Sequence, residues 1–207
     1  LKLGDALCQS TLNANVVIVC TELCTLHFQK ENTIDNITST ILFGDGCAAV
    51  LMQNNSNEKG ISINNFFSQV AFKGKADMAW NLSAKGFLMT LSGYVPNLVE
   101  QDFDNLVNKA LQNSLLDKSE ITHWCIHPGG KKILEAIEKS ILLPQGSLAH
   151  SYNVLKDYGN MSSPTILFVL QNIFDELKGQ RENNKAKIFG AAFGPGLTME
   201  TFIASYD

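Results

Sequence analysis

Hydrophobic and polar positions along the chain follow two periods, one typical of strands and one typical of helices. Short apolar runs between turn residues predict strands over residues 15–22, 61–69, 87–93, 122–127, 186–193 and 197–206. Residues 39–55 predict a glycine-rich turn followed by a buried strand. Apolar residues at helical spacing predict helices over residues 1–13, 95–116 and 131–142, and a last helix from Pro164. Strands and helices that follow one another in this way indicate a layered α/β fold.

The stretch NNSNEKG is the most linker-like part of the chain. We therefore expect a boundary near residue 58 that separates a part formed by residues 1–58 from a part formed by residues 59–207. The chain lacks a starting methionine and begins inside a predicted helix. We therefore expect further residues before Leu1.

Composition narrows the possible functions. Of the 207 residues, 45% are hydrophobic and 17% are charged, which is typical of a globular protein with a large core. The net charge is −4 and the basic residues are scattered, so no nucleic-acid partner is expected. No apolar run approaches the roughly 20 residues of a membrane span, and no signal peptide is visible. The five cysteines lack zinc spacing, so we expect no metal and predict buried free thiols in a cytoplasmic protein.

The stretch CIHPGGKK places His127 directly after an apolar strand and before a predicted helix. Pro128 and two glycines open that helix, and free amides at a helix start can bind an anion or a carbonyl oxygen. His127 is therefore a candidate for a site at the strand end. A packed histidine of the core is the alternative.

The stretch YGNMSSP contains a second candidate, Asn160, just before the helix that begins at Pro164. Ser162 or Ser163 can cap the free amides of that helix. Asn160 either closes the turn or directs its amide at a ligand. In the second case Asn160 and His127, from separate elements, could donate hydrogen bonds to one developing oxyanion, as acyl transfer requires.

The stretch LFGDGCAAV places Phe43 before a tight turn, and its glycines permit another backbone segment to approach closely. Ordinary core packing is the alternative for Phe43. Glu22 lies in the apolar stretch IVCTELC. Because burying an unpaired carboxylate is costly, we expect Glu22 to have a polar partner.

Four stretches together resemble a known family. FGDGCAAV, HPGG, YGNMSSPTILFVL and FGPGLTMET are similar, in order and approximate spacing, to the second half of the chalcone synthase-like type III polyketide synthases, and other details are similar to the bacterial branch. The resemblance covers the whole chain. It implies the thiolase fold, two similar halves in an α-β-α-β-α sandwich that forms a homodimer. Residues 1–58 would end the N-terminal half, and residues 59–207 would form the C-terminal half.

The resemblance implies an acyltransferase with a Cys-His-Asn site that uses coenzyme A thioesters and no separate cofactor. His127 and Asn160 match the histidine and asparagine of that site. The nucleophilic cysteine is expected about seven residues before Leu1, at a helix start where the helix dipole and an imidazolium lower the pKa of a thiol. Cys8 lies too far along that helix for this role. Coenzyme A binding is implied for Gly129, Gly130 and Lys132.

The resemblance also implies a reaction and a cavity. An acyl starter moves from coenzyme A to the cysteine, malonyl-CoA is decarboxylated, and the resulting enolate condenses with the acyl group. Soft, weakly polar side chains in the cavity wall favour an aliphatic starter. The residues that match cavity positions are Glu22, Cys24, His27, Phe43, Trp80, Met89, Ser162, Phe193 and Gly194. The last two belong to the matching loop 193–196, before which Ala192 replaces a usual glycine.

Two other functions remain open at this point. One is a ketoacyl synthase III-like condensing enzyme that takes its substrates from a carrier protein. The other is a non-catalytic lobe with a structural role, because the expected nucleophile is not in the sequence. The starter, the number of extensions and the type of ring closure have no sequence signal.

Overall fold

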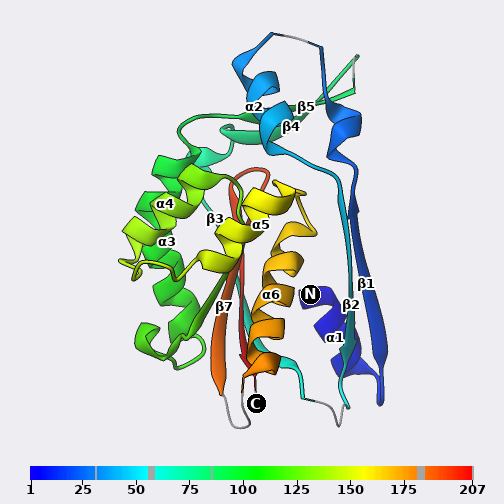
Figure 1. Cartoon of the computed structure of the whole chain (residues 1–207), viewed down its shortest axis with the longest axis vertical. Coiled ribbons are helices and arrows are strands. Elements are labelled where there is room, and N and C mark those ends of the chain that lie inside the picture. Colours follow the sequence, from blue (N-terminus) through cyan, green and yellow to red (C-terminus); the bar gives the residue numbers. More distant parts are fainter. Residues whose placement is uncertain (31, 56–58, 85, 181–184, 207) are drawn as a thin grey trace.

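The computed structural model describes residues 1–30, 32–55, 59–84, 86–180 and 185–206. Figure 1 shows a central sheet between two layers of helices, with a second, two-stranded sheet beyond one of those layers. The layered α/β prediction is therefore confirmed. The boundary predicted near residue 58 lies outside the described residues and stays a prediction.

The central sheet has the strand order β3-β8-β7-β6. β3 pairs antiparallel with β8, β8 pairs antiparallel with β7, and β7 pairs parallel with β6. A parallel pair needs a long crossover, and helices α4 to α6 supply it here. The strand bounds are β3 Ile61–Val70, β6 His123–Ile126, β7 Ala186–Gly194 and β8 Thr198–Tyr206.

Helices cover both faces of the central sheet. Successive side chains of β6 point to opposite faces of the sheet and so enter different cores. Trp124 and Ile126 belong to the core on the α3 and α4 side, and Cys125 belongs to the core on the α6 side. Helices α3 and α4 end before the predicted ends, because Leu115 and Leu142 adopt positive φ angles. The helices are α3 Val95–Gln112, α4 Lys131–Ser140, α5 Ala149–Tyr158 and α6 Thr165–Gly179.

The second sheet pairs β1, Asn15–Glu22, with β2, Gly46–Gln53, in antiparallel register. Helix α1, Lys2–Ser10, packs on one face of this sheet, and α6 packs against β2. On the other face, the side chains of Val17 and Leu51 are opposite one another, and both are exposed. The predicted strand over residues 15–22 is confirmed, but the prediction that the following strand is buried was wrong.

Smaller elements gather at one end of the molecule (Figure 1). They are the 3₁₀ turn η1, Cys24–His27, the helix α2, Ile34–Leu42, and the hairpin of β4, Met78–Ser83, with β5, Gly86–Leu91. Helix α2, helix α5 and strand β4 were not predicted from the sequence. Two further 3₁₀ turns are η2, Phe72–Gly74, and η3, Lys118–Glu120. None of the helices in the described ranges has both the length and the hydrophobicity of a membrane span.

Candidate active site

The two glycine-containing turns singled out in the sequence lie against each other. The amide of Gly44 donates to the carbonyl of Asn160 at 3.0 Å, and the amide of Asn160 donates to the carbonyl of Leu42 at 2.9 Å. A Cβ atom on Gly44 would lie 2.9 Å from the backbone oxygen of Tyr158, and one on Gly46 would overlap Met161. The prediction that these glycines admit another backbone segment is confirmed, and the contact fixes the position of Asn160.

Asn160 is 5% exposed, and its side chain connects two loops. Its Nδ2 donates to the carbonyl of Gly129 at 3.3 Å, and its Oδ1 accepts from the amide of Ser162 at 2.9 Å. The asparagine therefore does close its own turn. An amide nitrogen carries two hydrogens, and no described residue accepts the second one, so that N–H is available to a ligand.

His127 directly follows β6 and is 7% exposed. Its backbone amide donates to the carbonyl of Ala191 at 2.8 Å, which extends the β6–β7 pairing by one residue. Burial lowers the pKa of the imidazole to about 4, so the ring is neutral at pH 7. The imidazolium implied by the family resemblance belongs beside the thiolate of the expected upstream cysteine and stays a prediction. Among the described residues, none forms a hydrogen bond with the ring.

His127 and Asn160 meet at Gly129. A Cβ atom on Gly129 would lie 3.7 Å from Cδ2 and 3.9 Å from Nε2 of the His127 ring, while the carbonyl of Gly129 accepts from Asn160. The motifs HPGG and YGNMSS, more than 25 residues apart, are therefore neighbours in space. A neutral imidazole and a primary amide that lie close together in this way can present two N–H donors to one oxygen, as an oxyanion hole does.

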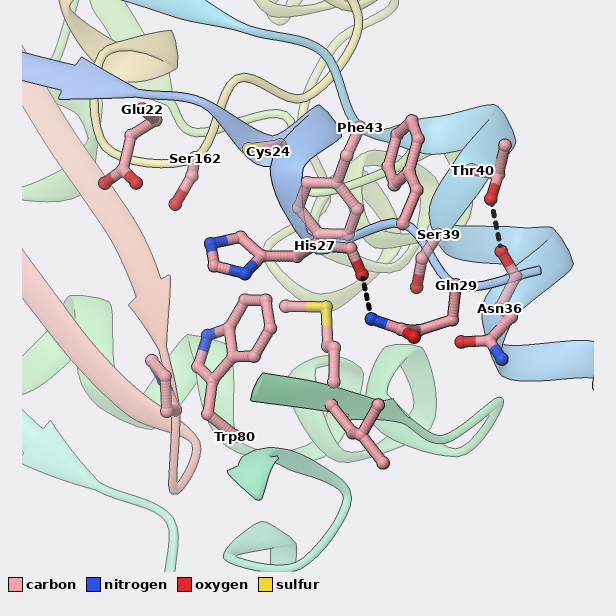
Figure 2. A pocket seen from close by; sticks show the side chains of 14 residues that line it. Glu22, Cys24, His27, Gln29, Asn36, Ser39, Thr40, Phe43, Trp80 and Ser162 are labelled. Atoms are coloured by element: carbon pink, nitrogen blue, oxygen red, sulfur yellow. Dashed lines mark hydrogen bonds between the residues drawn. The ribbon is translucent and has the colours of Figure 1, made fainter. Parts of the chain in front are cut away.

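A cavity of about 520 Å³ lies beside this pair, between η1, α2 and the β4–β5 hairpin. Seven of the residues predicted to form a substrate cavity line it, namely Glu22, Cys24, His27, Phe43, Trp80, Met89 and Ser162. Figure 2 shows the rings of His27, Phe43 and Trp80 directed toward one another across the cavity. The ring centroids of His27 and Trp80 are 5.3 Å apart, with an angle of 60° between the ring planes.

The carboxylate of Glu22 has the polar partner that its apolar surroundings required. The hydroxyl of Ser163 donates to Oε1 of Glu22 at 2.6 Å. That hydroxyl is not the cap of α6, and no side chain at the N-cap of α6 accepts a hydrogen bond, so the predicted serine cap was wrong. The amide of Thr165 instead donates to the backbone carbonyl of Ser162.

Cys24 lines the cavity but is a poor nucleophile. Burial first, and then the negative charges of Glu22 and Asp45, raise the pKa of its thiol to about 11. The thiolate, which is the reactive form, is therefore scarce at pH 7. This agrees with a role for Cys24 in the wall of the cavity.

Several predicted site residues lie outside the cavity. Phe193 packs against the core, with its ring centroid 6.1 Å from that of Phe103, while Pro195 of the same predicted loop, residues 193–196, lines the cavity. Gly194 ends β7 and is not among the lining residues. His127 and Asn160 do not line this cavity, and Phe43, which does line it, pairs with Asn160. That the two side chains bind one oxyanion stays a prediction.

The proposed coenzyme A residues lie at the start of α4. Gly129 and Gly130 precede the helix, and Gly130 lies next to the side chain of Leu42. Lys132 is exposed on the first turn. None of the three lines the cavity. Their role stays a prediction.

The sequence did not identify part of the cavity wall. Helix α2 and the loop before it supply polar groups, and β5 supplies an apolar one. A threonine cap at Thr33, which accepts from the amide of Asn36 at 3.2 Å, was the available signal for α2. The unpredicted lining residues are Phe28, Gln29, Asn36, Ser39, Thr40 and Leu88.

The five cysteines are free thiols, as predicted. The prediction that they are buried holds only for Cys8 and Cys125. Cys20 and Cys24 are partly buried, and Cys47 is exposed. Within the described ranges, no group of three or more histidine, cysteine or acidic side chains could hold a metal ion.

Comparison with family models and relatives gives a consistent result. Residues 63–205 match the chalcone and stilbene synthase C-terminal domain, and residues 1–70 match 3-oxoacyl-[acyl-carrier-protein] synthase III. A "Putative chalcone synthase" of Bacillus subtilis (strain 168) is 32% identical over 97% of this chain and 56% of its own length. The alpha-pyrone synthesis polyketide synthase-like Pks18 of Mycobacterium tuberculosis is 30% identical over 89% of this chain and 48% of its own length. The chain thus spans about half the length of these relatives.

Solved structures show the same architecture. 1,3,6,8-Tetrahydroxynaphthalene synthase from Streptomyces coelicolor A3(2) superposes with a TM-score of 0.90 at 26% identity, over 100% of this chain and 58% of that one. PKS-I from the brown alga Ectocarpus siliculosus, at 24% identity, has a TM-score of 0.90 over 100% of this chain and 56% of its own, which supports the fold alone. The fold is the thiolase fold, as predicted. The chain belongs to the chalcone and stilbene synthase family.

Proposed function

We propose that this chain carries the histidine and asparagine of a type III polyketide synthase that condenses an acyl-CoA starter with malonyl-CoA. The observation that supports this most strongly is the convergence of the His127 ring and the Asn160 amide on Gly129, each with an N–H that is available to a ligand. Two family members that cover this chain, Pks18 and tetrahydroxynaphthalene synthase, are named as polyketide synthases.

The proposed reaction has three steps. A cysteine thiolate, expected upstream of Leu1, attacks the starter thioester and releases coenzyme A as its thiolate. Malonyl-CoA then loses carbon dioxide, and the electron pair of the broken C–C bond forms an enolate of acetyl-CoA. The enolate carbon attacks the acyl carbonyl, and the tetrahedral intermediate expels the cysteine thiolate to give a β-ketoacyl-CoA.

His127 and Asn160 act on the oxygen of malonyl-CoA in this proposal. As carbon dioxide leaves, negative charge develops on the thioester oxygen, and two fixed N–H donors stabilise it. In this chain, burial lowers the pKa of His127 to about 4, so the ring is a neutral hydrogen-bond donor. A cysteine thiolate close to the ring would raise this pKa, since an opposite charge favours the imidazolium.

The cavity beside the pair is the proposed acyl site. Its wall combines the Phe43 and Trp80 rings with the Met89 thioether, and the ionisable thiol of Cys24 stays protonated there. Such a wall favours an aliphatic starter over a phenolic one. Homodimer formation and a cytoplasmic location are further parts of the proposal that rest on the family resemblance and the free cysteines.

Product formation without a carrier protein tests the proposal. The whole protein encoded by the gene is incubated with decanoyl-CoA and malonyl-CoA, and the products are identified by mass spectrometry. Pyrones or resorcinols are expected. Condensation only after a malonyl-carrier protein is added would instead support the ketoacyl synthase III alternative, which the match over residues 1–70 keeps open. No condensation under either condition would support a non-catalytic lobe.

A further inference from the structure

The 3₁₀ turn η1 forms one wall of the cavity but has weak support of its own. It contains only four residues, Cys24–His27, and no side chain of the N-cap residue Leu23 binds its free amides. A single 3₁₀ turn of this kind has poor hydrogen-bond geometry and unsatisfied amides at its start. Another segment must therefore hold Cys24 and His27 in the cavity wall.

Asp45 supplies that support from the glycine turn. Its Oδ1 accepts from the backbone amide of Thr25 at 2.9 Å, and its Oδ2 accepts from the hydroxyl of Thr25 at 2.7 Å. These bonds, the backbone one first, hold the pKa of Asp45 below its usual value, with the amide of Cys24 adding to the effect. The carboxylate therefore caps η1 from a segment 20 residues away in the sequence.

Asp45 is itself held in place by the site. Its neighbours Gly44 and Gly46 are the glycines that pack against the Asn160 turn, where a Cβ atom would meet Tyr158 or Met161. One rigid contact thus fixes the catalytic candidate Asn160 and, through Asp45, the wall that carries Cys24 and His27.

We infer that Asp45 is a positioning residue that sets the starter specificity of the cavity by fixing η1 through Thr25. The inference rests on the proposed condensing function. It predicts that loss of the Asp45–Thr25 bonds moves His27 relative to Trp80 and changes which acyl chain fits. The selectivity between a long and a short starter should therefore change by more than about twofold.

Four variants of the whole protein test this. Asp45→Ala and Thr25→Val remove the bonds. Asp45→Asn and Thr25→Ser keep them, since an asparagine oxygen can accept the amide and its nitrogen can donate to the threonine hydroxyl. The first readout is the ratio of kcat/KM for decanoyl-CoA to that for acetyl-CoA, which should change only in the first pair. A ratio that stays within about twofold of wild type in Asp45→Ala and Thr25→Val overturns the inference.

The second readout does not need turnover. Within this chain, Trp80 is 42% exposed and Trp124 is 6% exposed, so of these two iodide quenches mainly Trp80, and the difference from a Trp80→Phe variant isolates its emission. The fraction of tryptophan emission that iodide quenches should change in Asp45→Ala and Thr25→Val. It should stay at the wild-type value in Asp45→Asn and Thr25→Ser. Unchanged emission in all four variants overturns the positioning role. If the wild-type protein forms no product, the proposed function fails, while the emission still decides whether Asp45 positions η1.

Discussion

The lobe built on the central sheet is packed very differently from the outer part of the molecule, which consists of residues 1–55 and the β4–β5 hairpin. In the lobe, large side chains such as Phe103, Phe189 and Ile188 are completely buried. Among the described residues of 1–55, only Gly4 and Cys8 are buried, and alternate side chains of β1 and β2 are exposed. The proposed oxyanion donors belong to the tightly packed lobe, and much of the cavity wall belongs to the open part.

Within residues 1–207, which span about half the length of the relatives, this difference separates two tasks. Donors to a developing charge must be held within fractions of an ångström, which dense packing provides. A wall that selects a starter needs only a suitable shape, and it can vary without disturbing the donors. Substitutions in the lobe should therefore change stability or rate, whereas substitutions in the wall should change specificity.

The largest expected effect concerns stability. Phe103→Ala should lower the free energy of unfolding by about 3–5 kcal/mol, because it removes a fully buried ring from the core on α3. In the 207-residue chain, Val17→Ala, in β1, should change it by about 0.5 kcal/mol or less, because Val17 is 64% exposed there. Urea titration of both variants measures the difference. Equal losses would contradict the contrast between the two regions.

The next effect concerns rate. His127→Gln or Asn160→Ala should slow malonyl-CoA decarboxylation by roughly 100- to 1,000-fold, since each removes one donor to the enolate oxygen. Circular dichroism should show folded protein, because the backbone bonds of Asn160 to Gly44 and Leu42 do not need its side chain. His123→Gln, in the strand that leads to His127, is the control and should decarboxylate like wild type. If either variant decarboxylated malonyl-CoA at the wild-type rate, the substituted residue would not be a stabiliser of the enolate.

A third effect concerns pH. His127 has a folded-state pKa of about 4 against an ordinary 6.5, so the unfolded chain binds its proton first as the pH falls. The free energy of unfolding should therefore be unaffected by His127 above pH 6.5. It should fall as the pH is lowered from 6.5 to 4, by up to about 3 kcal/mol. Urea titrations at several pH values should show this loss in wild type and much less of it in His127→Gln.

His123 provides the comparison for the pH experiment. Burial lowers its pKa as well, but the negative charge of Glu176 opposes that shift. His123→Gln should therefore remove less of the pH dependence than His127→Gln. If His123→Gln removed more, the assignment to His127 would be wrong.

The smallest effect concerns a thiol of the wall. With a pKa of about 11, Cys24 should react slowly with iodoacetamide at pH 8 and faster as the pH approaches that value. Glu22→Gln removes one of the charges that raise this pKa, so alkylation should begin at lower pH. Peptide mass spectrometry reports the rate at Cys24. Rapid modification at pH 8 in wild type would show that the wall is more open than the structure indicates.

The sequence predicted most of the lobe and the convergence of the two donors. Strands such as residues 61–69 and 186–193 were recognisable because they are short apolar runs between turn residues, and the glycines around Asp45 gave a reason for close backbone contact. His127 and Asn160 were singled out as candidates because motif order and a family resemblance indicated a long-range proximity that local periodicity cannot show.

The outer part was harder to predict. Helix α2 is rich in isoleucine and threonine, which are weak helix formers, and its Ile34 and Ile41 are more than 80% exposed, so its apolar pattern does not mark a buried face. Strand β4 similarly exposes Trp80 and Leu82. Asp45 had no distinguishing signal, because an aspartate in a glycine turn is common and its partner Thr25 is brought close only by the fold.

The central claim is that His127 and Asn160 bind one thioester oxygen. A crystal structure of the whole protein with acetoacetyl-CoA, a thioester that cannot lose carbon dioxide, tests it most directly. We expect the thioester oxygen to lie about 3 Å from a ring nitrogen of His127 and from Nδ2 of Asn160. A thioester bound elsewhere, with this oxygen out of hydrogen-bond reach of both side chains, would contradict the claim.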